Sequence, residues 1–300
     1  IPESATAGYA YTIDLNENAV WEDGTPINAD TYVYSMQQLL RPELLNYRAS
    51  DYYSGDRVIA GAQNYANQGQ TKLLSITDAM ASAGITSLDE FLAEYGDQTA
   101  YINWSYSFGY AYDFENYPFD GTTVDPAGLS LEATDETVES PLTLSEMYVF
   151  YPQCYGTDEA NIALGQSYFP DEIYINWTYP SDLSFDTVGL YKSGDYQITI
   201  VFGKSLSGFN LLYSLTSNWI VYQDLYESCL TENNGVWTST YNTSADTTVS
   251  YGPYSLTEYQ SGKAMRFEKN ESWYGYTDGQ HQYVDPVDGQ TYDMYQTTAI

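Results

Sequence analysis

The apolar residues of this chain fall into short runs that alternate with polar residues and are separated by Gly, Pro, Asn and Asp. No run approaches the roughly 20 apolar residues that a membrane-spanning helix needs. Residues 9–15 alternate with the period of a strand, whereas residues 29–40 repeat apolar positions at helical spacing. A folded chain of 300 residues buries about 75% of its unfolded surface. The pattern therefore predicts mixed strands and helices around a core that needs no disulfide or metal.

The charge balance is strongly acidic, with 9 Lys and Arg against 41 Asp and Glu, and a net charge of −32. Such a field repels phosphate backbones and anionic lipids, which argues against nucleic acid and membrane surfaces as partners. His281 is the only histidine, and we expect it to be exposed. One histidine and two cysteines, Cys154 and Cys229, argue against His-based triads and zinc or iron–sulfur sites. We therefore expect no metal and no cofactor, and the cysteines either form a disulfide or are separate buried thiols.

The clearest helix signal follows a turn at residues 21–26. Asn28 is a suitable N-cap, and Val33, Met36 and Leu40 share one face that we expect to be buried. The other predicted elements are hairpins at 188–202 and 254–268, helical turns at 209–215 and 221–229, an exposed loop at 120–141, and two similar edge-facing strands of one sheet at 101–106 and 174–179.

Three ordered motifs carry a resemblance to a known family. The first is YTIDLNENAVWEDGTPINADTYVYS at residues 11–35, and the second is DYQITI at residues 195–200. The third is GPY at residues 252–254, followed by FEKN and WYG at residues 267–275. Together they resemble the family 5 extracellular solute-binding proteins, the oligopeptide and dipeptide receptors of bacterial ABC importers. In the third motif Trp and Tyr stand in exchanged order.

The resemblance implies an α/β fold, a mixed α+β lobe of the type II periplasmic-binding-protein kind, in which the second lobe is largely absent. Residues 1–70 and 183–277 would form lobe one, residues 71–182 an insertion within it, and residues 278–300 the start of the connection to the second lobe. Residues 292–300 alternate like a strand entering that lobe. With one wall of the site, we expect this chain alone to bind peptide no tighter than about millimolar.

The resemblance also suggests site residues by position. Those expected to face a ligand are Tyr47, Tyr52, Tyr53 and Trp219. Those expected to be structural are Trp21, Asp23, Gly24, Pro26, Gly252, Pro253 and Tyr254. In the turn, Asp23 would cap with its side chain, Gly24 would supply the positive φ angle, and Trp21 would fill the core. The terminal charge clamps of a peptide would lie in the second lobe and are not assigned here.

The resulting prediction is a receptor, not an enzyme. It would capture peptides, specifically oligopeptides, outside the cell and deliver them to ABC permease subunits. We expect a monomeric cell-surface lipoprotein or periplasmic protein whose signal segment lies outside this chain. The alternative from a different class is an extracellular glycoside hydrolase or carbohydrate-binding protein that uses carboxylates and stacked aromatics.

Overall fold

The computed structural model describes residues 8–55, 58–103, 111–130, 136–215 and 219–300. The chain divides into two compact units. Unit 1 comprises Ile1–Ala66 and Leu183–Ile300, and unit 2 comprises Asn67–Asp182. Each has its own hydrophobic core. Among the described residues, none of the helices is long and apolar enough to cross a membrane.

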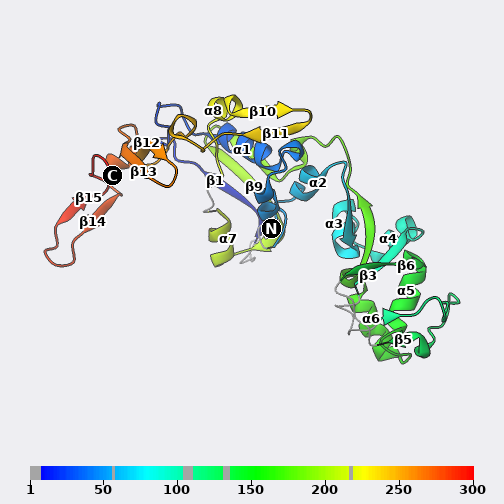
Figure 1. Ribbon diagram of the computed structural model, residues 1–300. Coiled ribbons are helices and arrows are strands. Elements are labelled where there is room, and N and C mark those ends of the chain that lie inside the picture. The colour runs from blue at the N-terminus through cyan, green and yellow to red at the C-terminus, as the bar shows by residue number, and fades with distance from the viewer. Residues whose placement is uncertain (1–7, 56–57, 104–110, 131–135, 216–218) are drawn as a thin grey trace. The chain divides into compact units, whose positions relative to one another are not determined.

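Unit 1 is built on a three-stranded antiparallel sheet in the order β1-β9-β8 (Figure 1). Its helices are α1 (Ala29–Leu40), α2 (Ala62–Asn67), α7 (Gly208–Leu215) and α8 (Gln223–Ser228). Its strands are β1 (Gly8–Asp14), β8 (Leu190–Gly194), β9 (Gln197–Leu206), β10 (Leu230–Asn233), β11 (Val236–Ser239), β12 (Tyr254–Gln260), β13 (Ala264–Lys269), β14 (Gln282–Val284) and β15 (Thr291–Asp293). The last six strands pair as three antiparallel hairpins. The predicted mixture of helices and strands is confirmed.

Helix α1 packs on the β8 and β9 side of this sheet. Asn28 caps it by accepting the Thr31 backbone N–H, as the sequence predicts. Met36 and Leu40 are buried, but Val33 is only half-buried. Ser35 is buried instead. Its hydroxyl can be buried because it donates to the Thr31 carbonyl and accepts the Val221 N–H.

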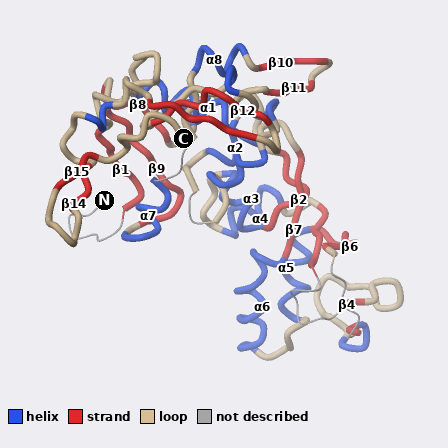
Figure 2. Tube along the Cα trace, turned by 60° about the vertical axis from the view of Figure 1, so that its left-hand side comes forward, coloured by secondary structure: helices blue, strands red, loops and turns tan. Residues whose placement is uncertain are grey.

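Unit 2 is a second mixed unit around a four-stranded antiparallel sheet in the order β2-β7-β3-β6. Its helices are α3 (Ile76–Ala83), α4 (Leu88–Tyr95), α5 (Leu144–Gln153) and α6 (Glu159–Glu172). Its strands are β2 (Thr71–Ser75), β3 (Thr99–Asn103), β4 (Ala111–Tyr112), β5 (Leu129–Ser130), β6 (Thr137–Thr143) and β7 (Ile173–Thr178). Figure 2 colours the helices blue and the strands red along the Cα trace. Aromatic rings dominate the core, including Phe91, Phe150, Phe169 and Trp177.

Two expectations for unit 2 need correction. The similar segments at 101–106 and 174–179 do share a sheet, with Tyr101 opposite Tyr174, but they are its two central strands rather than its edges. Residues 104–106 lie outside the described residues. The predicted loop at 120–141 ends in strand β6, which contains Pro141. β6 is an edge strand, where a residue without an N–H is tolerated on the unpaired side.

The end of the chain also differs from the expected strand at residues 292–300. β15 is short and pairs with β14, and the backbone then returns to β13, where Phe267 and Ile300 exchange two hydrogen bonds of 2.9 Å. The free edge of β13 offers unpaired backbone groups, and pairing satisfies them. This places the last residues of the chain beside the third motif.

Candidate functional site

The first motif forms a tight turn whose tryptophan is buried in unit 1. Trp21 is 2% exposed. Asp23 accepts the Thr25 backbone N–H at 2.9 Å and the Tyr222 hydroxyl at 2.7 Å. Partial burial acts to raise the pKa of Asp23, but these hydrogen bonds outweigh it and leave the pKa below its usual value. Gly24 has a φ of +87°, which an L side chain would adopt only under strain.

Trp21 joins the first motif to distant segments of the same unit. Its ring centroid lies 5.5 Å from that of Tyr222 and 5.3 Å from that of Tyr251, which immediately precedes the third motif. Glu22 adds two backbone bonds: its N–H donates to the Ser250 carbonyl at 2.9 Å, and its carbonyl accepts the Ser272 hydroxyl at 3.0 Å. More than 200 residues of sequence separate these partners, yet they form one packed surface.

The third motif is closed by hydrogen bonds within itself. Asn270 donates its side-chain amide to the Gly252 carbonyl at 2.8 Å and its backbone N–H to the Pro253 carbonyl at 2.9 Å. The Tyr276 hydroxyl also donates to Pro253, at 2.5 Å. Tyr254 begins β12 and is half-buried. These contacts fix how the β12–β13 hairpin leaves the rest of unit 1.

The second motif meets the first at the start of α1. The Ala29 N–H donates to the Asp195 carbonyl at 2.9 Å, and the Leu15 N–H donates to the Tyr196 carbonyl at 2.8 Å. Lys192 bridges the two segments through its ammonium group, 2.8 Å from Asp30 and 3.2 Å from the Asp195 carboxylate. The first motif therefore contacts the second at the start of α1, and its turn at Trp21 and Glu22 packs beside the third.

An aromatic cluster lies on another part of α1 and contains two of the four expected ligand residues. The Trp219 ring centroid is 5.4 Å from Tyr32 on α1 and 6.4 Å from Tyr52, the last residue of a 3₁₀ helix (Tyr47–Tyr52). Tyr52 is 4% exposed, and burial raises the pKa of Tyr32. The cluster of Tyr32, Tyr52 and Trp219 packs against the core of unit 1. Tyr32 belongs to the YVYS end of the first motif and was not predicted as a site residue. Its position four residues before the buried Met36 is the helical spacing that could have indicated it.

The other two expected ligand residues are not part of this cluster. Tyr53 is half-buried against the core of unit 1, whereas Tyr47 is 85% exposed at the start of the 3₁₀ helix. Ligand contact by Tyr47, Tyr52, Tyr53 and Trp219 stays a prediction.

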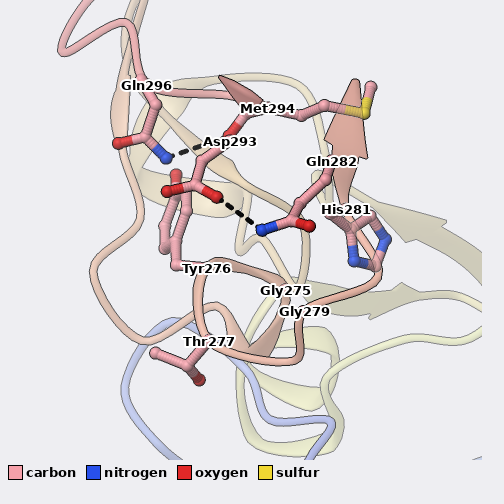
Figure 3. A pocket seen from close by; sticks show the side chains of 9 residues that line it. All are labelled: Gly275, Tyr276, Thr277, Gly279, His281, Gln282, Asp293, Met294 and Gln296. Atoms are coloured by element: carbon pink, nitrogen blue, oxygen red, sulfur yellow. Dashed lines mark hydrogen bonds between the residues drawn. The ribbon is translucent and has the colours of Figure 1, made fainter. Parts of the chain in front are cut away.

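Two surface pockets lined by described residues of unit 1 lie near the motifs. One, of about 230 Å³, lies beside the first motif and is lined by Trp21, Asn28, Asp30, Tyr222 and Asp224 among others. The second, of about 150 Å³, lies between residues 275–282 and 293–296 and is drawn in Figure 3.

His281 lines the second pocket, which corrects the expectation that it is exposed. It is half-buried, with its ring centroid 4.7 Å from that of Trp273 and its Nδ1 2.7 Å from an Asp278 carboxylate oxygen. The Gly-rich sequence around it indicates a loop but does not show that Trp273 lies beneath.

Neither cysteine is bridged. Cys154 is half-buried in unit 2 and Cys229 is buried in unit 1, and both are free thiols. Burial raises the pKa of Cys154 to about 12, so it has no nucleophilic thiolate at neutral pH. Within the described ranges, no group of three or more His, Cys, Asp or Glu is arranged to hold a metal ion.

Comparison with known proteins gives matches among solved structures. No family model matches, and no curated protein matches. The chain is similar to Listeria monocytogenes OppA bound to peptide, with 14% identity and a TM-score of 0.36, covering 91% of this chain and 31% of that one. The substrate-binding domain of an oligopeptide ABC transporter from Bacillus anthracis gives 13% identity and a TM-score of 0.39, over 90% of this chain and 30% of that one.

A third similar structure is MppA, a periplasmic murein tripeptide-binding protein in its unliganded open form, with 15% identity and a TM-score of 0.38. The match covers 90% of this chain and 28% of MppA. Their descriptions name a bound peptide, an oligopeptide transporter and a murein tripeptide, respectively. The chain spans less than a third of the length of each.

Proposed function

We propose that this chain is part of the substrate-binding receptor of an ABC importer, which captures peptides outside the cell and passes them to the membrane permease. The supporting observation is the convergence of the three motifs. The segments at residues 11–35, 195–200 and 252–275 resemble one family by sequence alone, and the first of them is hydrogen-bonded to the second through Ala29 and to the third through Glu22. If the three short motifs resembled the family only by chance, there would be no reason for them to be neighbours in the fold.

In this proposal unit 1 is lobe one of the receptor, unit 2 is the insertion within that lobe, and residues 278–300 lead towards the second lobe. The ligand would be an oligopeptide held on a wall that includes the cluster of Tyr32, Tyr52 and Trp219. Rigid aromatic side chains suit this role because they offer large contact areas at a low cost in conformational entropy. The receptor would act as a monomer at the cell surface, as a lipoprotein, or in the periplasm.

The test is binding without turnover. Because one wall alone should bind at best at about millimolar affinity, saturation-transfer NMR on this chain with a library of tri- to hexapeptides is a suitable assay. We expect saturable transfer to peptides and no change in their concentration over hours. Trp219→Ala should weaken the signal, whereas Trp237→Ala, a half-buried tryptophan on β11, should leave it unchanged.

A parallel assay with oligosaccharides in place of peptides discriminates the alternative. Release of reducing ends from an oligosaccharide panel would establish a glycoside hydrolase, and saturable binding of sugars alone would establish a carbohydrate-binding protein. If Trp219→Ala and Trp237→Ala reduce peptide binding equally, the aromatic cluster is not part of the binding wall. The receptor assignment would then stay in place.

A further inference from the structure

The pocket lined by His281 has room for a small chemical group. Its volume of about 150 Å³ is several times the roughly 30 Å³ that one water molecule occupies in the liquid. Figure 3 shows Gln282 and Asp293 facing each other from the two strands of the β14–β15 hairpin, with the backbone of Gly275 and Gly279 opposite. The thioether of Met294 flanks the opening.

The hydrogen-bond donors of this pocket are largely used within the protein. The Tyr276 hydroxyl donates to the Pro253 carbonyl, and the Thr277 hydroxyl donates to the Tyr274 carbonyl at 3.3 Å. The Gln282 amide donates to one Asp293 carboxylate oxygen at 3.0 Å, and the Gln296 amide donates to the Met294 carbonyl at 3.1 Å. These internal bonds use both hydroxyl hydrogens and one of the two N–H groups of each amide.

The acceptors of the pocket are in excess. A carboxylate accepts at two oxygens, and one oxygen of Asp293 is taken by Gln282, which leaves the other for a ligand. The amide oxygen of Gln282 is another acceptor of the lining, and it lies on the side of the amide that points away from Asp293 (Figure 3). None of the nine residues that line the pocket is Lys or Arg. The pocket is therefore negative and rich in acceptors, and the net charge of −32 raises the local concentration of cations around it.

The wall behind the pocket is rigid. Trp273 is 7% exposed, and its ring packs edge-on against Tyr276, His281 and Tyr295, with centroids 5.0, 4.7 and 5.2 Å away. Asp278 fixes His281 through its carboxylate, which also accepts the Gln280 backbone N–H at 2.8 Å. A wall held in this way needs little reordering when a ligand binds, and this preserves affinity.

We propose that this pocket binds an organic cation, the primary ammonium or guanidinium group of a small molecule or peptide. A cationic donor group complements the second oxygen of the Asp293 carboxylate, and charge-assisted bonds of this type are the strong ones. A bare metal ion fits less well, because the described residues hold no cluster of three or more His, Cys, Asp or Glu. None of the residues that line this pocket belongs to the aromatic cluster of Tyr32, Tyr52 and Trp219, and the inference does not rest on the proposed function.

His281 makes the test direct, since it is the only histidine in the chain and its ring protons give isolated NMR signals from the pocket itself. We would titrate the whole chain at pH 8 and constant ionic strength with three probes. Nα-acetyl-lysine amide presents a side-chain ammonium, agmatine a guanidinium with an amine, and glycinamide an α-ammonium. Nα-acetyl-glutamine amide is the neutral control. Saturable shifts of the His281 signals are expected with the cations, and the probe that binds most tightly identifies the source of the group.

Two matched variants separate a site from general attraction to an acidic protein. Asp293→Asn removes one charge from the pocket and retains an oxygen for Gln282, and it should weaken binding at least tenfold. Asp288→Asn removes the same charge from the turn of the same hairpin, outside the lining, and should change affinity less than twofold. Equal weakening by both variants, or equal shifts with the neutral control, would overturn the proposal.

Discussion

Replacing Trp21 by Ala tests whether the three motifs stabilise one another. Trp21 is 2% exposed, and truncation of a buried tryptophan to Ala typically costs about 3–5 kcal/mol. The tilted contact of its ring with Tyr222 and the edge contact with Tyr251 contribute about 0.5–1.5 kcal/mol each beyond burial. We therefore expect a loss near the upper end of that range, about 5 kcal/mol, comparable with the whole stability of many domains.

The assay is urea unfolding followed by near-UV circular dichroism. With a slope of about 2 kcal/mol per M, the midpoint of unit 1 should fall by roughly 2.5 M, while a transition of unit 2 should not move. Trp237→Ala is the control, since it loses mainly a cation–π contact with Arg41 at 4.4 Å, worth about 1 kcal/mol. If Trp21→Ala does not fold, a double-mutant cycle of Trp21→Phe with Tyr251→Leu still measures the coupling.

The coupling energy decides the interpretation. A value of about 0.5–1.5 kcal/mol between Trp21 and Tyr251 is expected for rings in direct contact. A loss below 1 kcal/mol for Trp21→Ala, or a coupling of zero, would refute the view that the first and third motifs form one packed surface.

Gly61→Ala should lower the free energy of unfolding by several kcal/mol, because its new Cβ would lie 2.1 Å from the Thr187 carbonyl oxygen. Gly55→Ala is the control, since Gly55 has a similar positive φ but open space around it, and it should cost about 1–2 kcal/mol in thermal unfolding. Cys154 has a pKa raised by burial to about 12, so about one thiol in 10⁴ is ionised at pH 8. Its reaction with Ellman's reagent should be slow in the native protein, and two thiols should react in urea; one or none would contradict the free cysteines. The backbone N–H of Gln280 is the main cause that lowers the pKa of Asp278, so Asp278 stabilises the fold above about pH 4 and this contribution is lost as the pH falls through the lowered pKa. The thermal midpoint of Asp278→Asn should therefore fall less between pH 5 and pH 2 than that of the wild type, and parallel curves would refute this.

The elements that the sequence predicts well are those whose signals are local. The strand at residues 9–15, the Asn28 cap and the hairpin at residues 254–268 each contain their own alternation, cap or turn, and the structure has all three. The helix spanning Leu144–Gln153 was missed although Leu144, Met147, Phe150 and Tyr151 are buried at helical spacing. The apolar Val149 is 43% exposed on another face, and it blurs the contrast between the two faces in the sequence.

The site is less predictable than the fold, for a physical reason. Tyr32, Tyr52 and Trp219 are far apart in sequence, and only tertiary packing brings their rings within 6.4 Å. The same holds for the burial of His281, which depends on Trp273 and Tyr295 from two other turns of the chain. Abundant tyrosine hides such positions, because 34 similar side chains give no reason to prefer one over another.

Pairing of β1 with β9 has a consequence during synthesis of the chain. β1 ends at Asp14 and its partner ends at Leu206, so about 190 residues must be added before the pair is complete. At roughly 5–20 residues per second, β1 waits about 10–40 s for its neighbour. Unit 2 is contiguous and is fully translated within that interval, so it can fold first. During this time Tyr11 and Ile13 lack the sheet that later covers them, and β1 is the segment of the nascent chain that a holding chaperone would meet.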